Sequence, residues 1–255
     1  MHPNYNTNLI NTVMKKILFV IVAMVMCAGN ARAFEYEPEQ GFSWMGIFGM
    51  NVSKLQNHDF GAKAGAVLGA RVDFVLPKAH GTYLTAGLDW TMKGGKGEEP
   101  DITIDGKDYD VNGKYALHYF EVPIRVGFRY NPTESIGLYG EVGPYFAVGF
   151  AGRHKISIDE DGSAFRDIED NASYVAFKNY GYPTESFQRW DAGIGFRIGA
   201  EYNHHYNLLI GCDWGLADIY RVSYRDAFKD DTANAGRVLP KVRNFNFSIT
   251  FGYRL

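Results

Sequence analysis

From Arg189 to Tyr202 the chain alternates strictly between two kinds of residue. Every second position is apolar or aromatic, and the positions between them hold only charges and glycines. Because successive residues of a β-strand point to opposite faces, this pattern predicts a strand with one apolar and one polar face. The apolar face is longer than the roughly 9–11 residues that a tilted strand needs to cross a bilayer, and aromatic residues stand at both of its ends. The stretch therefore predicts a membrane-spanning strand.

The same design recurs along the chain. Predicted strands cover 42–53, 62–76, 82–92, 117–130, 136–150, 188–202, 207–217 and 242–255. After a first connection of moderate length, short turns at 77–81, 131–133 and 203–206 alternate with long polar connections at 93–116, 151–187 and 218–241. Outer-membrane barrels show this alternation, with short periplasmic turns and long outer loops. The sequence predicts an all-β fold: an eight-stranded antiparallel up-and-down transmembrane β-barrel over 42–255, with both termini in the periplasm.

The distribution of charge decides which face of the predicted strands points outward. The apolar face carries no charged residue, although 22% of the chain is charged. A water-soluble barrel has no need of a charge-free outside, whereas Arg or Lys at the midplane of a lipid-facing surface costs roughly 2–4 kcal/mol. We therefore expect the apolar face to contact lipid and the charged face to line the lumen.

Side chains alone fill the interior of an eight-stranded barrel. The predicted lumen charges, seven of each sign, are therefore expected to pair across it and form a plug against solute flux. This predicted lumen charge network consists of Lys63, Arg71, Asp73, Asp89, Glu121, Arg125, Arg129, Glu141, Arg189, Asp191, Arg197, Glu201, Asp213 and Arg254.

The N-terminus has the features of a secretory signal peptide over 1–33. Lys15 and Lys16 precede an apolar run, and an A-x-A cleavage site follows at Ala31 and Ala33. Met14 is an alternative start, and 34–41 is predicted to be a periplasmic lead. Cleavage would remove three basic residues and no acidic one, which takes the net charge from −3 to −6. That balance is not the electrostatic footprint of a nucleic-acid-binding protein.

Three motifs suggest specific chemistry, and each has a simpler interpretation. The glycines of 193–199 resemble a dinucleotide fingerprint, but their spacing differs and no helix follows, so we expect them to make room for lumenal arginines. The acidic segment 159–163 could bind Ca²⁺ but lacks a closing Glu, so a solvated loop is favoured. His154 has Ser157 and Asp159 nearby in sequence, but no Gly-x-Ser-x-Gly element is present. We predict no catalytic residue, no cofactor and no metal site.

Six segments and three short motifs carry a family resemblance. The motifs are Lys93-Gly94-Gly95, Glu121-Val122-Pro123 and Gly143-Pro144-Tyr145. The segments are GIFGMNVSKL (46–55), TYLTAGLDWTMKGGK (82–96), YFEVPIRVGFRY (119–130), GLYGEVGPYFAVGF (137–150), DAGIGFRIGAEY (191–202) and NFSITFGYRL (246–255). Together they resemble the PorT-like outer-membrane β-barrel family, within the wider group of small OmpA/OmpX-like barrels. The resemblance implies a Gram-negative outer membrane and no catalytic residues. The founding member of that family is implicated in type IX secretion, and most of its relatives have no assigned role.

These observations favour a non-enzymatic outer-membrane protein with a structural or accessory role in the envelope, including a link to secretion. The alternative is a ligand-binding or adhesion module that acts through the three long connections, since long loops commonly carry function. A lipid-modifying enzyme is the third and least favoured hypothesis. The expected partners are outer-membrane lipid and lipopolysaccharide, the barrel-assembly machinery, and envelope or secretion proteins, with no nucleic acid.

Overall fold

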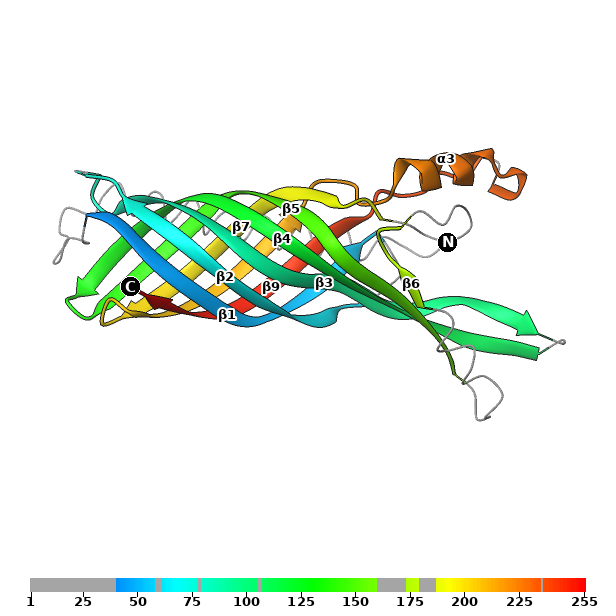
Figure 1. The fold of residues 1–255 in the computed structure, drawn as a ribbon, viewed down its shortest axis with the longest axis horizontal. Helices are drawn as coiled ribbons and strands as arrows, with labels where there is room; N and C mark the ends of the chain where they lie inside the picture. The colour runs from blue at the N-terminus through cyan, green and yellow to red at the C-terminus, as the bar shows by residue number, and fades with distance from the viewer. Residues whose placement is uncertain are drawn as a thin grey trace, which may run out of the picture.

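The computed structural model describes residues 40–57, 61–77, 79–104, 107–159, 173–178, 187–234 and 236–255 (Figure 1). The predicted signal peptide, with Ala31 and Ala33, and the predicted lead as far as residue 39 lie outside the described residues. The elements are β1 Gly41–Gln56, β2 Lys63–Val75, β3 Thr82–Ile104, β4 Lys107–Thr133, β5 Ile136–Asp159, β6 Ser173–Val175, β7 Trp190–Tyr202, β8 Tyr206–Gly215, α3 Val222–Asp230, η1 Thr232–Asn234 and β9 Arg243–Arg254.

The strands form one closed antiparallel barrel. All nine belong to a single sheet, and each long strand pairs with its neighbours in the chain. β1 also pairs with β9, from Met45 opposite Arg254 to Gln56 opposite Arg243, and this pairing closes the ring. The three-residue β6 pairs with β5 outside the ring. The predicted eight-stranded antiparallel barrel is therefore confirmed.

The two ends of the barrel differ. At one end, which we call the turn end, only a few residues join β2 to β3, β4 to β5 and β7 to β8. The last of these turns places Asn203 and His204 at φ values of 50° and 61°, a left-handed conformation that Asn adopts more readily than most residues. The C-terminus lies at this end, where the Leu255 N–H donates to the Trp44 carbonyl. We call the opposite end the mouth.

At the mouth, the prediction of a long connection over 93–116 is wrong. β3 continues to Ile104, β4 starts at Lys107, and the two strands pair almost to their ends, so that a hairpin projects beyond the barrel (Figure 1). The sequence in this region is rich in Gly, Asp and Glu, and its few alternating apolar residues, such as Ile102 with Ile104 and Tyr109 with Val111, do not form a continuous apolar face. Strand pairing outside the membrane does not need an apolar face, so the pattern that marks the barrel strands is missing there.

The other two long connections also contain regular structure. The 151–187 connection includes the end of β5 and the short β6, and the 218–241 connection includes α3 and η1. α3 buries Tyr224, and Arg225 next to it forms an ion pair with Asp218. Within the described ranges, no helix is long and apolar enough to cross a membrane.

The outer wall of the barrel is apolar, as its strand patterns predict. The side chains assigned to this face stay exposed at the surface that lipid would cover. They include Trp44, Phe48, Leu68, Leu84, Val126, Phe146, Ile194, Leu208 and Phe251. The buried polar residues instead fill the lumen, which makes it the candidate site.

Candidate functional site

The lumen contains all but one residue of the predicted charge network in buried positions. Arg71 and Arg125 are among the largest side chains in the protein with less than 2% of their surface exposed. The exception is Arg189, which is exposed because β7 begins one residue later, at Trp190. The Nη1 of Arg189 donates to the Gly149 carbonyl at 3.2 Å instead of entering the lumen. Its assignment to the network was wrong.

Lys63 is buried but does not join the lumenal ion pairs. Its Nζ donates to the Ala64 carbonyl at 3.4 Å, and it forms no ion pair with any residue that the structure describes. Lys63 is instead close enough to Lys114 and His118 of β4 that its positive charge repels a positive charge on either of them. The alternation of exposure along β4 places both of these residues on its outward face.

The layer nearest the turn end is a ring of two cations and two carboxylates. Arg254 reaches Asp73 at 2.7 Å through Nη1 and Glu201 at 2.8 Å through Nε. Arg129 lies 3.4 Å from Asp73 and 3.8 Å from Glu201. Each carboxylate is thus shared between two guanidinium groups, so the charge of this layer is balanced within the protein.

The middle layer contains three arginines and three carboxylates. Arg71 pairs with Asp89 at 3.0 Å and lies 3.9 Å from Glu141. Tyr83 donates a hydrogen bond of 2.8 Å to Glu141. On the other side of the lumen, Asp213 accepts from Arg125 at 3.3 Å and from Arg197 at 3.4 Å. The charges of this layer balance as well.

The layer nearest the mouth is centred on Lys93, which sequence reasoning had placed in a connection. Lys93 Nζ lies 2.8 Å from Glu121 and 3.4 Å from Asp191. It also lies 4.4 Å from the centre of the Tyr145 ring, a cation–π contact. Asn244 donates to Asp191 at 2.9 Å. The signal that could have identified Lys93 is the alternation of β3, which continues inward from Asp89 by two steps of two residues.

Glycines provide the space for these side chains. Gly87 lies opposite Arg71, and a Cβ at Gly87 would come within 2.9 Å of Arg71 Cγ. Gly211 lies opposite Arg197, and a Cβ there would come within 2.7 Å of Arg197 Cγ. Gly195, within the predicted glycine motif, faces the Arg125 guanidinium in the same way. The motif lies in β7 and opens no helix. Its interpretation as room for arginines is confirmed at Gly195 and is wrong at the other two glycines, because a Cβ at Gly193 would meet the Trp214 carbonyl and one at Gly199 would meet the Tyr139 ring.

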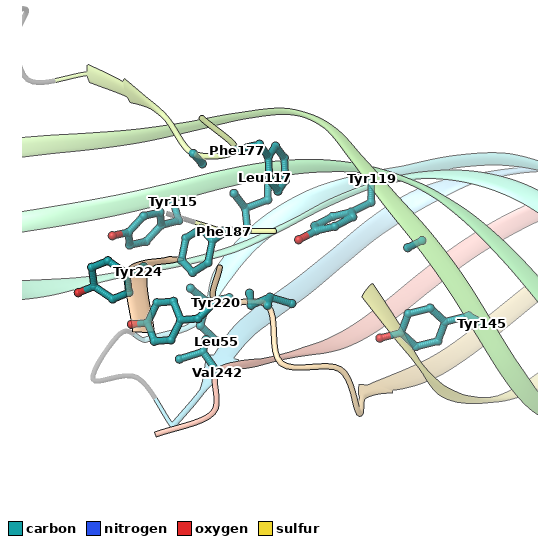
Figure 2. Close-up of a cluster of buried hydrophobic side chains, with 13 residues drawn as sticks. Leu55, Tyr115, Leu117, Tyr119, Tyr145, Phe177, Phe187, Tyr220, Tyr224 and Val242 are labelled. Carbon is teal, nitrogen blue, oxygen red and sulfur yellow. The ribbon is translucent and has the colours of Figure 1, made fainter. Parts of the chain in front are cut away.

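A cluster of buried apolar side chains covers the lumen at the mouth (Figure 2). We call it the mouth cluster. It consists of Leu55, Tyr115, Leu117, Tyr119, Tyr145, Ala147, Ala176, Phe177, Phe187, Ile219, Tyr220, Tyr224 and Val242. Phe187 stacks on Tyr220 with 5.6 Å between ring centres and 4° between ring planes. Tyr119 meets Phe177 edge to face at 5.7 Å. The cluster joins barrel strands to two outer connections, and no local sequence pattern marks such contacts.

The other candidate sites find no support as centres of chemistry. His154 is buried and stacks on Tyr115 with 3.9 Å between ring centres, so its ring packs within the mouth. Asp159 ends β5, and the rest of the predicted calcium segment, 160–163, lies outside the described residues. Within the described part of the chain, no group of three or more His, Cys, Asp or Glu residues could hold a metal ion.

Comparisons with known proteins agree with this architecture. A family model described as "Outer membrane protein beta-barrel domain" matches residues 28–221. The narrower PorT-like resemblance stays a prediction, and no curated protein matches the chain.

Similar solved structures include three membrane barrels. The attachment invasion locus protein Ail of Yersinia pestis is 12% identical, with a TM-score of 0.39, over 85% of this chain and 100% of its own. OprG of Pseudomonas aeruginosa is 14% identical, with a TM-score of 0.37, over 86% and 98%. Neisserial surface protein A is 11% identical, with a TM-score of 0.37, over 85% and 99%.

Proposed function

From the premise that the chain belongs to the outer membrane protein β-barrel family and resides in the Gram-negative outer membrane, we propose a function for it. The proposal is that it is a non-enzymatic envelope protein that acts through partners. Its role in this proposal is structural or accessory. The filled lumen supports the proposal most strongly, because three ion-paired layers and the mouth cluster lie one after another between the two ends. A barrel of this kind offers its surfaces and its ends to other molecules, and no path for solutes.

The partners that fit this role are outer-membrane lipid and lipopolysaccharide, the barrel-assembly machinery during insertion, and envelope or secretion proteins. A secretion or envelope partner in the periplasm would meet the turn end, where His204 is about half exposed. The PorT-like resemblance supports this periplasmic side of the proposal.

A second candidate function, ligand binding or adhesion, is favoured by one specific observation. β3 and β4 continue as a paired hairpin beyond the barrel, and β5 extends beside β4 as far as Asp159 (Figure 1). Paired strands hold a binding surface in a fixed place above the membrane at a lower entropic cost than a flexible loop would. In this function, the barrel is the anchor and the hairpin carries the contact.

Electrical recording tests the closed lumen on which both candidates depend. The purified protein, reconstituted in planar bilayers beside an open porin as positive control, is expected to give no large stable conductance steps. Large stable pores would show that the charged layers do not fill the lumen, and the proposal of a non-conducting barrel would fail.

Cross-linking in intact cells separates the two candidates. A photo-reactive residue at His204 samples the turn end, and one at Lys178, an exposed residue of the mouth side, samples the outer surface. Capture of periplasmic or secretion proteins at His204 supports the accessory role. Binding through the hairpin is supported if partners are captured only at Lys178 and this capture is lost when a short turn replaces residues 97–113.

The masses of lipid A in a deletion strain test the third hypothesis, a lipid-modifying enzyme. Unchanged masses are expected for both candidate functions, and altered masses would point to an enzyme.

A further inference from the structure

Four basic residues share the outward face of three neighbouring strands at the mouth. Lys96 of β3 lies directly opposite Lys114 of β4, and Lys114 lies directly opposite Lys155 of β5. Arg153 lies two residues before Lys155 and therefore on the same face. All four side chains are exposed. We call these residues the basic row.

The facing lysines Lys96 and Lys114 of the basic row are electrostatically unfavourable by themselves. Like charges directly opposite each other on paired strands destabilise a sheet. Lys96 and Lys114 form no ion pair with any residue that the structure describes, and the buried charge of Lys63 adds to the repulsion at Lys114. An anion from outside the protein would offset this repulsion, so the row has the charge pattern of an anion-binding surface.

The apolar belt of β4 places the row relative to the membrane. Phe120 and Tyr130, the ends of the outward apolar set, lie ten residue steps apart, which is roughly 33 Å along the strand and roughly 25 Å across the membrane at the usual tilt. This height matches the lipid-facing band of an outer-membrane barrel. The belt therefore ends close to Phe120 on the mouth side.

Aromatic rings mark that edge of the belt on the same three strands. Phe120 of β4 stacks on Phe150 of β5 with 4.4 Å between ring centres, and Trp90 of β3 stacks on His118 at 5.8 Å. His118 pairs with Ala151, and Arg153 follows two residues later, about 7 Å along the strand. The basic row thus begins at the level of lipid headgroups, directly above an aromatic girdle.

We propose that the basic row binds the phosphate groups of lipid A in the outer leaflet. The mouth faces outward because the short turns of such barrels lie in the periplasm. Lysines bind phosphate as point charges, and the Arg153 guanidinium can donate two parallel hydrogen bonds. The hairpin beyond the row is acidic in sequence over 98–110. An anionic membrane surface would repel an acidic segment, so the basic row is the part of β3 and β4 that fits lipid A by charge. This inference rests on the proposed function, whose partners include lipopolysaccharide, and it narrows that partner to the lipid A phosphates at one site.

The test compares two variants that lose the same charge at the same end of the barrel. The row variant is Lys96→Gln, Lys114→Gln and Lys155→Gln, and its matched control is Lys229→Gln, Arg237→Gln and Lys241→Gln, which are exposed residues of the 218–241 connection. Each protein is reconstituted in phosphatidylcholine nanodiscs that contain diphosphoryl lipid A, and native mass spectrometry counts the lipid A that remains bound. Heat-modifiability on gels confirms that both variants are folded.

The row variant is expected to retain lipid A on the order of 10- to 100-fold more weakly than the wild-type protein, and Lys114→Gln alone about 5-fold more weakly. The control variant is expected to retain lipid A as well as the wild-type protein does. The wild-type protein is expected to bind dephosphorylated lipid A only weakly, about as weakly as the row variant binds the phosphorylated form. Equal retention by the two variants, or equal binding of dephosphorylated lipid A, would overturn the proposal. Displacement by millimolar inorganic phosphate would also overturn it, because the row would then be a general anion site.

Discussion

Lys93 holds together the lumenal layer nearest the mouth. It is the cation between Glu121 and Asp191, its side chain has no exposed surface, and the Tyr145 ring packs against its amino group. A buried carboxylate without a cation is far less stable than a paired one, because desolvation disfavours its charge. The stability of this lumenal layer therefore depends strongly on Lys93.

Replacement of Lys93 by Met removes that cation and keeps most of the volume. The free energy of unfolding is expected to fall by about 3–5 kcal/mol, because two buried carboxylates lose their partner. Urea unfolding of the barrel in lipid vesicles measures the change. Lys229→Met, at an exposed position, is the control and should change stability by less than about 0.5 kcal/mol. The double variant Lys93→Met/Glu121→Gln should recover part of the loss, and no recovery would mean that the charge of Glu121 is not the cause.

Gly195 leaves the space that the middle layer uses. A Cβ at this position would come within 2.9 Å of Arg125 Nη2 and would also clash with Asp213. Gly195→Ala is therefore expected to destabilise the barrel by about 1–3 kcal/mol in the same unfolding measurement. Gly46→Ala is the matched control, because nothing lies within 4 Å of the added Cβ. Equal effects of the two substitutions would show that strand propensity, and not lumen packing, selects glycine at 195.

At this scale the sequence identified most of the lumen through alternation alone. Arg71, Arg125 and Asp213 lie inside because the residues before and after each of them are suited to lipid. Alternation failed at the strand ends, where a shift of the strand boundary by one residue decides whether a side chain lies in the lumen. Lys93 precedes two glycines and was assigned to a connection, whereas Arg189 directly precedes β7 and was assigned to the lumen. Which carboxylate pairs with which cation depends on the closed ring and could not be predicted from the sequence.

Among the elements, the barrel strands were predictable and the outer structure was not. Within the membrane, lipid on one side and a filled lumen on the other impose a period of two on β7 and β9. Beyond the membrane, the ends of β3 and β4 are stabilised by pairing with each other, and α3 by contacts such as that of Tyr224 in the mouth cluster. Neither kind of stabilisation produces the continuous period of two that marks a lipid-facing strand.

Aromatic contacts are among those that hold the connection that carries α3 to the barrel. Tyr220 stacks on Phe187 and lies next to Tyr224, so it joins two outer segments over the lumen. Tyr220→Ala is expected to release this connection locally and to speed limited proteolysis between 218 and 241 about 10-fold, while the barrel itself stays folded. Val238→Ala, in the same connection at a position 85% exposed, should leave the cleavage rate unchanged. Cleavage at the wild-type rate in Tyr220→Ala would show that the stacking does not hold the connection.

For the whole molecule, the order of the layers makes the lumen a buried core in which most charges are paired. In the ring of Arg129, Arg254, Asp73 and Glu201, and in the middle layer, the charges cancel within the protein. Apolar side chains cover the layers at the mouth, so we expect them to keep electrolyte from the pairs on that side. The protein therefore has two kinds of charge: buried ion pairs, which we expect salt to affect little, and the exposed basic row, which salt can screen.

Ionic strength should separate these two kinds of charge in a single preparation. Raising NaCl from about 0.1 M to about 1 M shortens the screening length from about 10 Å to about 3 Å, and buried pairs are screened much less than exposed ones. We expect the free energy of unfolding in vesicles to change by less than about 1 kcal/mol, while lipid A retention falls toward the level of the row variant. The row variant is the control, since its low retention should respond little to salt. A marked loss of stability at high salt would mean that electrolyte enters the lumen, because screening weakens solvated ion pairs most. That result would contradict the proposal of a closed lumen.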